Sequence, residues 1–269
     1  MNKGVSFYFG FQMDAELRAK KIKEAGFDCV ITSADKKFNK QNGNISKQVK
    51  LFRKYGLKLS SLHMAYNSED LHYFWEDCKQ GEKLKKNLIK DVKIAKKYGF
   101  TCVVVHLYGE YSAIGERRLK EVLKVCEKLN VPLAIENINC QKVFLDTFKN
   151  IDSPFLKFCY DSGHNNIFDK GFDYFNKFGD KLITLHLHDD DGKTDQHTIS
   201  KISASIDWNE IAQGLSGKEN LSLDYELLNR KENNLTAEQY LEEAYKQACD
   251  LEKKIKACKK KDIKKKIKE

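Results

Sequence analysis

Short apolar runs alternate with longer segments of helical periodicity along the whole chain. The runs are rich in Val, Ile, Leu and aromatic residues, and they predict eight strands at 5–9, 27–32, 57–63, 101–106, 131–136, 155–161, 182–188 and 221–226. The segments between them predict helices at 14–25, 45–55, 81–98, 115–129, 143–149, 172–178, 208–214 and from 236 onward. Strand and helix therefore alternate throughout.

The predicted strands are continuously apolar, a pattern typical of strands that are buried on both faces. Parallel strands covered by helices meet that requirement. The tripeptides AGF, YGL and YGF end three of the predicted helices, each with a glycine suited to a left-handed cap before the next strand. Eight such units predict an α/β protein, a single (β/α)8 TIM barrel. An open doubly wound sheet is the less favoured alternative.

No linker divides the 269 residues. The two prolines, Pro132 and Pro154, stand beside apolar runs, and no Gly/Ser tract is present. Hydrophobic residues make up 41% of the chain, enough for a substantial core. We therefore expect one domain over residues 1–269, with a lysine-rich C-terminal helix or tail from about residue 253.

The positive charge is concentrated in that tail. Residues 253–269 hold ten lysines and two acids, a charge of +8, which leaves +1 of the total +9 for the rest of the chain. Such a neutral body shows no clear surface that would follow a phosphate backbone. The tail is interpreted as a solvated helix end, with an arm that binds nucleic acid or a membrane surface as the alternative.

Eight cysteines form no C-x-x-C pair and fall mostly inside apolar segments, so they are expected to be reduced core residues. The N-terminal MNKGVSFYFGF lacks the apolar stretch of a signal peptide, and no run approaches the length of a membrane span. We expect a cytoplasmic protein.

Six consecutive predicted strands end in a residue able to bind a metal. These residues are His63, His106, Glu136, Asp161, His186 with His188, and Glu226. Function in a TIM barrel lies where the strands end. A polar residue can simply mark the exit from the core, but six of the seven histidines lie in these strand ends and their loops, and only His72 lies apart.

Glu136, Asp161 and Glu226, with one imidazole from the seventh strand, form a mixed oxygen and nitrogen ligand set. Because no cysteine joins it, the set favours Mn²⁺, Zn²⁺, Co²⁺ or Fe²⁺ over softer ions. Residues two apart on a strand share a face, so His186 and His188 are both candidates for that imidazole.

Two further pairs extend the cluster. DSGH places His164 three residues after Asp161, and DQH places Asp195 two residues before His197. Either pair is suited to a second cation or to substrate. The alternatives are that His164 orients Asp161 and that Asp195 caps a turn after Gly192.

The aromatic segment YNSEDLHYFWED, residues 66–77, follows the third predicted strand. It is interpreted either as a lid that excludes water from a bound ligand or as a segment packed against the outer helices.

The motifs SLHMAY, VVVHL, AIEN, YDSGH, LHLHDDDGKTDQH, SIDW and YELL occur in this order over most of the chain. Together they resemble the xylose-isomerase-like TIM-barrel superfamily, which contains sugar and sugar-phosphate isomerases and epimerases and also the endonuclease IV type of abasic-site nuclease. The superfamily often has a Gly-rich segment where this chain has TISKISASIDW, which leaves the substrate fit open.

The resemblance to ketose epimerases implies a metal held by Glu136, Asp161, His186 and Glu226, proton transfer by the two glutamates, and substrate contact at His164. The resemblance to endonuclease IV implies three ions and nine ligands, all present here: His63, His106, Glu136, Asp161, His164, His186, Asp195, His197 and Glu226. The segments ENIN and DSGH are more similar to the isomerase branch.

We therefore expect a divalent-metal-dependent isomerase or epimerase of a small keto sugar, sugar phosphate or related polyol. Proton transfer would run through a metal-stabilised enediolate, with Glu136 and Glu226 catalytic on opposite faces of the reacting carbon. One to three ions of Mn, Zn, Co or Fe are expected. His63, His106, His164, His188, Asp195 and His197 would hold further ions or substrate.

The alternative is a zinc-dependent phosphodiesterase of the endonuclease IV type acting on abasic DNA, with Tyr66 inserted into the duplex and the lysine tail on phosphates. A barrel that binds a ligand without turnover is less favoured, since binding alone does not need two opposed carboxylates around a cation. The expected partner is a small carbohydrate, nucleic acid is not favoured, no membrane is expected, and a homo-oligomer stays open.

Overall fold

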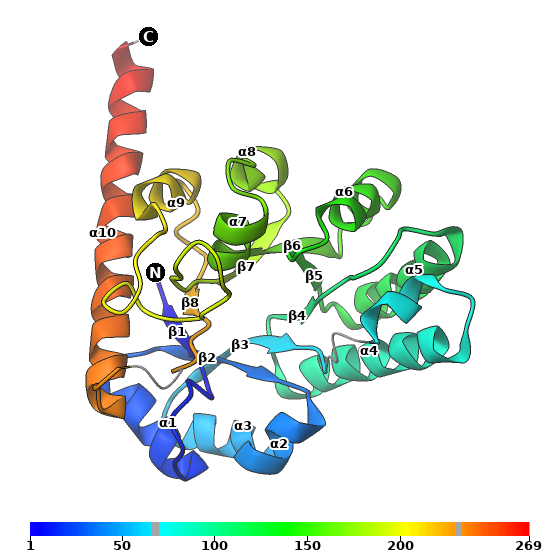
Figure 1. Cartoon of the computed structure of the whole chain (residues 1–269), viewed down its shortest axis with the longest axis horizontal. Coiled ribbons are helices and arrows are strands. Elements are labelled where there is room, and N and C mark those ends of the chain that lie inside the picture. Colours follow the sequence, from blue (N-terminus) through cyan, green and yellow to red (C-terminus); the bar gives the residue numbers. More distant parts are fainter. Residues whose placement is uncertain (66–69, 230–232, 269) are drawn as a thin grey trace.

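Eight parallel strands form a barrel in the computed structural model, with helices around it (Figure 1). The strands are β1 (Lys3–Ser6), β2 (Cys29–Ser33), β3 (Lys58–His63), β4 (Cys102–Val105), β5 (Leu133–Glu136), β6 (Leu156–Asp161), β7 (Leu182–His186) and β8 (Leu223–Tyr225). They are ordered β7-β6-β5-β4-β3-β2-β1-β8. A parallel bridge between Leu187 and Tyr225 joins the two ends of the sheet, so the predicted (β/α)8 barrel is confirmed.

The structure describes residues 1–65, 70–229 and 233–268, and beyond residue 260 the helical backbone alone. The helices are α1 (Ala15–Glu24), α2 (Lys36–Asn42), α3 (Ile45–Lys54), α4 (Lys79–Tyr98), α5 (Ala113–Leu129), α6 (Gln141–Asn150), α7 (Ser162–Phe168), α8 (Tyr174–Phe178), α9 (Trp208–Gly214) and α10 (Ala237–Lys268), with a 3₁₀ helix, η1 (Leu71–Trp75). Within the described residues no helix is both long and apolar enough to cross a membrane.

All eight predicted strands are present, and the apolar pattern missed three short helical segments. These are α2, η1 and α7. α2 and α7 begin at the side chains of Asp35 and Asp161, which accept hydrogen bonds from the backbone N–H groups of Phe38 and His164. Capping by one aspartate, rather than a long amphipathic face, therefore defines these two helices.

Glycine ends three helices as predicted. Gly26, Gly56 and Gly99 follow α1, α3 and α4 with φ angles of 104°, 65° and 91°. These values lie in the region that residues with a side chain rarely adopt. The chain thus turns sharply at these points into β2, β3 and β4.

The 3₁₀ helix η1 packs into the protein instead of standing free above it. Leu71, Phe74 and Trp75 are buried. The buried guanidinium of Arg118 donates to the backbone carbonyls of Phe74 and Glu76 at 2.8 and 2.6 Å. The packing interpretation is therefore correct for the described part of the segment 66–77, whereas residues 66–69, including Tyr66, lie outside the described residues.

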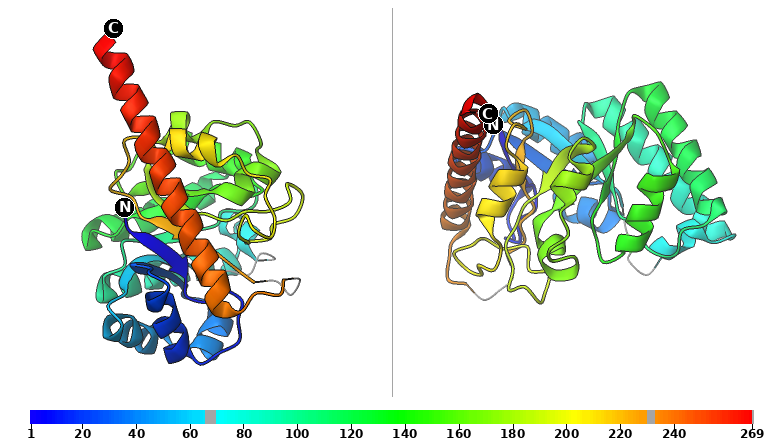
Figure 2. Two further views of the ribbon diagram at one scale, coloured as in Figure 1. Left: turned by 90° about the vertical axis from the view of Figure 1, so that its left-hand side faces the viewer. Right: turned by 90° about the horizontal axis from the view of Figure 1, so that it is seen from above.

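Helix α10 runs along the outside of the barrel past α9, and its last turns project beyond the body (Figure 2). Four lysines of the described part of the tail have polar partners: Lys253 with Asp250, Lys254 with Asn209, Lys256 with Glu252, and Lys259 with Glu219. Three of these four partners are carboxylates, so this part of the tail is a helix whose lysine charges are partly neutralised by neighbouring acids.

We predict that Arg118→Lys lowers the free energy of unfolding by about 2–4 kcal/mol, because an ammonium group cannot replace the several hydrogen bonds of a buried guanidinium. Urea unfolding followed by circular dichroism measures the change. Arg117→Lys, at the exposed neighbouring position, is the matched control, and equal stability of the two variants would contradict the role assigned to Arg118.

Candidate functional site

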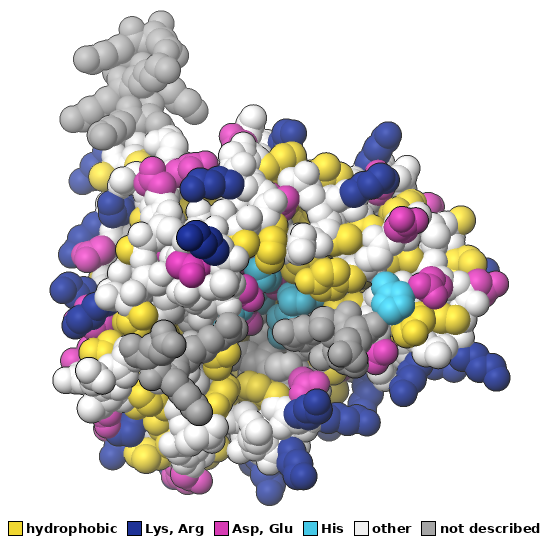
Figure 3. Space-filling model, in the orientation of Figure 1, with side chains coloured by type: hydrophobic (Ala, Val, Ile, Leu, Met, Phe, Trp, Pro, Cys, Tyr) yellow, Lys and Arg dark blue, Asp and Glu magenta, His cyan; other side chains and the backbone are white. Residues whose placement is uncertain are grey.

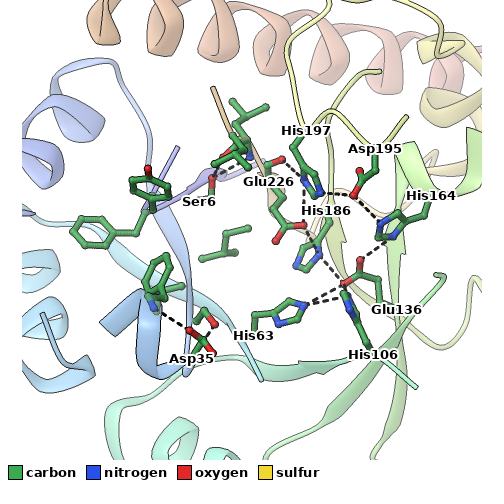
Figure 4. Close-up of a pocket in the computed structure, with 18 of the residues that line it drawn as sticks. Ser6, Asp35, His63, His106, Glu136, His164, His186, Asp195, His197 and Glu226 are labelled. Atoms are coloured by element: carbon green, nitrogen blue, oxygen red, sulfur yellow. Dashed lines mark hydrogen bonds and ion pairs between the residues drawn. The ribbon is translucent and has the colours of Figure 1, made fainter. Parts of the chain in front are cut away.

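The carboxyl ends of β3 to β8 bring the predicted ligands together at one end of the barrel. His63, Glu136, Asp161 and His186 are the last residues of β3, β5, β6 and β7, while His106 and Glu226 directly follow β4 and β8. Because neighbouring parallel strands are paired in register, Asp161 lies beside His186. Figure 4 shows the side chains of His63, His106, Glu136, His186 and Glu226 pointing toward one another.

The four residues predicted to share an ion form one group. One ligand atom from each of Glu136, Asp161, His186 and Glu226 can be chosen so that all four lie within 4.8 Å of one another. His186 Nδ1 lies 2.9 Å from Glu136 Oε2 and 3.2 Å from Glu226 Oε2. This spacing is compatible with a common cation.

Two further imidazoles approach Glu136 from β3 and β4. The Nε2 atoms of His63 and His106 lie 3.7 and 3.1 Å from Glu136 Oε2, and 3.2 Å from each other. His63 Nδ1 lies 2.9 Å from the carbonyl oxygen of Met64. Such a contact favours the tautomer with the proton on Nδ1, so that Nε2 is the nitrogen that faces Glu136 and His106.

A third group comes from α7 and the long loop between β7 and α9. His197 Nε2 lies 3.0 Å from Asp195 Oδ2, and His164 Nε2 lies 3.6 Å from the same oxygen. His197 adopts φ 49°, a left-handed conformation that is rare for residues other than glycine and that marks functional sites. The turn after Gly192 is held by Asp191, which accepts from Lys193 and Thr194, so Asp195 is not its cap.

Several polar atoms of these groups are buried without a hydrogen-bond partner. They are both carboxylate oxygens of Glu136, Asp161 Oδ2, His164 Nδ1, both ring nitrogens of His186, and Asp195 Oδ1. Some of these atoms lie about 3 Å from one another without the geometry of a hydrogen bond, for example His186 Nδ1 and Glu136 Oε2. Buried polar groups normally have partners. A divalent cation fits this donor set.

The electrostatics of the cluster follow from mutual neutralisation. Burial would raise the pKa of Glu136, but the neighbouring imidazoles hold it well below its usual range. Burial likewise would raise the pKa of Glu226, and His186 and His197 outweigh that effect. Conversely, burial would lower the pKa of His197, whereas the carboxylates of Asp195 and Glu226 raise it to about 9.

One residue near the site was missed by the sequence reasoning. Cys159, two residues before Asp161 on β6, forms a further group with Glu136 and His186 within 4.8 Å. The expectation that no cysteine joins the site was therefore wrong. Burial raises the pKa of the Cys159 thiol well above its usual range, which disfavours the thiolate form that binds metals. The sequence did contain a signal for this, because residues two apart on a strand point to the same face and Cys159 lies two residues before Asp161 on β6.

A cavity of about 560 Å³ opens onto the ligand groups, and Figure 3 shows imidazoles inside the hollow of this face. The wall opposite the ligands comes from the end of β1 and the residues after it, from β2, and from the start of α2 with its cap, with two leucines after β8. These residues are Ser6, Phe7, Tyr8, Ile31, Thr32, Ser33, Asp35, Lys37, Phe38, Leu227 and Leu228. His188 does not line this cavity. The size is typical of sites for small molecules.

The family model for the xylose isomerase-like TIM barrel matches residues 19–252, most of the chain. The chain belongs to this family. Two partial relatives are protein y4fM of Sinorhizobium fredii (strain NBRC 101917 / NGR234), 30% identical over 37% of this chain, and a protein of Methanocaldococcus jannaschii, 30% identical over 30% of this chain. The matched stretches span 34% of the length of each relative.

Solved structures of the same fold cover nearly all of the chain. A D-tagatose 3-epimerase-like protein is 20% identical with a TM-score of 0.75, covering 97% of this chain and 99% of that chain. D-psicose 3-epimerase from Clostridium cellulolyticum is 17% identical with a TM-score of 0.70, covering 96% and 99%. The 3-keto-D-glucoside 4-epimerase of E. coli is 14% identical with a TM-score of 0.67, covering 94% and 99%. At these identities the likeness shows the shared fold.

We predict that the affinity of the protein for Co²⁺ or Mn²⁺ rises between pH 6 and pH 8. The ion-free protein keeps a proton on His197 up to about pH 9, and an ion must displace that proton to bind an imidazole. Calorimetric titration in buffers of different ionisation enthalpy measures both the affinity and the protons released. His197→Gln should release fewer protons, and equal proton release by the variant and the unchanged protein would contradict the assignment.

Proposed function

We propose that the protein is a divalent-metal-dependent isomerase or epimerase of a small keto sugar, sugar phosphate or related polyol. The observation that carries the proposal is the position of Glu136 and Glu226. Their carboxylates flank His186 Nδ1 at 2.9 and 3.2 Å, beside a cavity of about 560 Å³ that has room for a small molecule. The sugar epimerases among the structures of the same fold support this choice.

A cation would polarise a substrate carbonyl and so make the C–H group next to it more acidic. The residues that would hold the cation are Glu136, Asp161, His186 and Glu226. Glu226 is 26% exposed in its side chain, whereas Glu136 is 1% exposed. Their pKa values, lowered by the imidazoles, keep both carboxylates ionised and able to accept a proton. One glutamate would remove a proton from the carbon, and the other, after taking up a proton from solvent, would donate it to the opposite face of that carbon.

The wall opposite the ligands offers groups that suit a polyol. Tyr8 and Phe38 meet edge to face with centroids 6.4 Å apart, and Asp35 and Lys37 line the same wall. A carboxylate accepts and an ammonium group donates hydrogen bonds, so the two side chains can bind different sugar hydroxyls. Lys37 is the one lysine among the described residues that line the cavity.

We predict that a ketose panel assayed with Mn²⁺ or Co²⁺ in deuterated water includes a sugar that gains deuterium next to its carbonyl. Glu226→Gln should slow that exchange by about 10²-fold or more, because the amide cannot accept the proton. Mass spectrometry of the recovered sugar measures it. Glu210→Gln, at an exposed position on α9, is the matched control. Absence of exchange for every sugar would contradict the proposal.

A second candidate function is a phosphodiesterase that uses three ions. It is favoured by three groups of possible ligands that contain no cysteine, two of which share Glu136. They are His63, His106 and Glu136; Glu136, Asp161, His186 and Glu226; and His164, Asp195 and His197. Against it, lysine and arginine side chains are scattered around the rim of the cavity face instead of following the hollow (Figure 3), whereas duplex binding needs many phosphate contacts.

Metal content and cleavage assays separate the two functions. The sugar proposal predicts that the protein leaves a duplex with a single abasic site intact under Zn²⁺ saturation. Inductively coupled plasma mass spectrometry gives the zinc per chain, and gel electrophoresis gives the cleavage. Cleavage beside the abasic site, lost in Asp195→Asn, would favour the phosphodiesterase instead.

A further inference from the structure

The two oxygens of the Asp161 carboxylate have different surroundings. Oδ1 accepts a hydrogen bond from the backbone N–H of His164 at 2.7 Å and lies 3.1 Å from His188 Nε2. Oδ2 is buried and has no hydrogen-bond partner. Asp161 belongs to the ligand group of Glu136, His186 and Glu226, so Oδ2 is the atom left for a cation.

His188 is locked in the position from which it meets Oδ1. Its backbone N–H donates to the hydroxyl of Ser162 at 2.9 Å, and that hydroxyl donates to the carbonyl of His188 at 2.7 Å. A Cβ atom on Gly163 would lie 2.0 Å from Cε1 of the His188 ring. The glycine of the DSGH motif therefore makes room for the imidazole.

His188 also reaches the third ligand group. Its ring stacks on the His197 ring with centroids 4.1 Å apart and an interplanar angle of 20°. Its Nε2 lies 3.8 Å from Asp195 Oδ1. One buried ring thus contacts a ligand of the central group and lies against two of the third.

We infer that His188 is a positioning residue, not a metal ligand. It donates a hydrogen bond from Nε2 to Asp161 Oδ1, and this bond orients the carboxylate so that Oδ2 faces the cation. His188 is fully buried, does not line the cavity and belongs to none of the ligand groups among the described residues. The sequence pattern places His186 and His188 on the same face of a strand, but the two residues have separate roles.

The inference rests on the ion site of the proposed function and is independent of the sugar. Hydrogen bonds to ligating carboxylates typically change metal affinity by 10- to 100-fold. The matched pair His188→Gln and His188→Met tests it, because the two side chains have similar length and only Gln offers an N–H donor. Met also adapts to irregular space, which favours folding of that variant.

The full chain is loaded with Zn²⁺ and titrated with a chromophoric chelator, and ions per chain are counted at saturation. We expect His188→Met to weaken the affinity about 10- to 100-fold, His188→Gln to stay within a few-fold of the unchanged protein, and saturation counts to stay equal. His72→Leu, at an exposed histidine outside the site, should change neither quantity.

Equal affinity of the Met variant and the unchanged protein would overturn the inference, as would the loss of one ion per chain in both variants, which would make His188 a ligand. Either result leaves the proposed function standing. A chain that binds no ion even without substitution would instead overturn the proposed function together with the inference.

Discussion

The main physical constraint on this structure is that acidic and imidazole groups are buried away from water at the carboxyl ends of the barrel strands. Glu136 is 1% exposed, neither of its oxygens has a hydrogen-bond partner, and imidazole nitrogens surround it at about 3 Å. Burying such groups without compensation costs several kcal/mol for each charge. A bound cation would compensate them, which would give a physical reason for six successive strands to end in residues able to bind a metal.

The scaffold around these groups fixes their orientation through hydrogen bonds that the barrel supplies. The loop that carries Asp195 and His197 is anchored by the buried carboxylate of Asp189. One oxygen of Asp189 accepts from the backbone N–H groups of residues 190, 205 and 206, and the other accepts from the Ser200 hydroxyl and the Trp208 indole. Preorganised ligands of this kind lose little entropy when an ion binds.

The barrel and the convergence of its strand ends could be predicted, because both follow from the alternation of apolar strands and amphipathic helices along the sequence. The strands are parallel and buried on both faces, so their carboxyl ends meet, and Glu136 and Asp161 had to converge once the barrel closed. The same reasoning placed the first strand two or three residues too late. Phe7 and Phe9 continue the apolar run but leave the sheet and are buried, where Phe9 packs against Tyr240 of α10.

Atomic detail within the site could not be predicted from spacing. His186 and His188 have equivalent positions in the pattern, and only the three-dimensional contacts distinguish them. Cys159 was excluded on the ground that it lies in an apolar segment, although its period of two from Asp161 directs it toward the ligands. His197 takes a left-handed conformation next to Thr198, which pairs with Asp189 in an antiparallel bridge. The local sequence pattern reveals neither feature.

We propose that side chains distant in the sequence coordinate a common cation at the carboxyl ends of the strands. The most direct test of this proposal is a crystal structure with anomalous data collected on both sides of the zinc or manganese absorption edge. The account predicts an anomalous peak at coordinating distance from Glu136, Asp161, His186 and Glu226. Water alone between these four side chains, in crystals saturated with either ion, would contradict it.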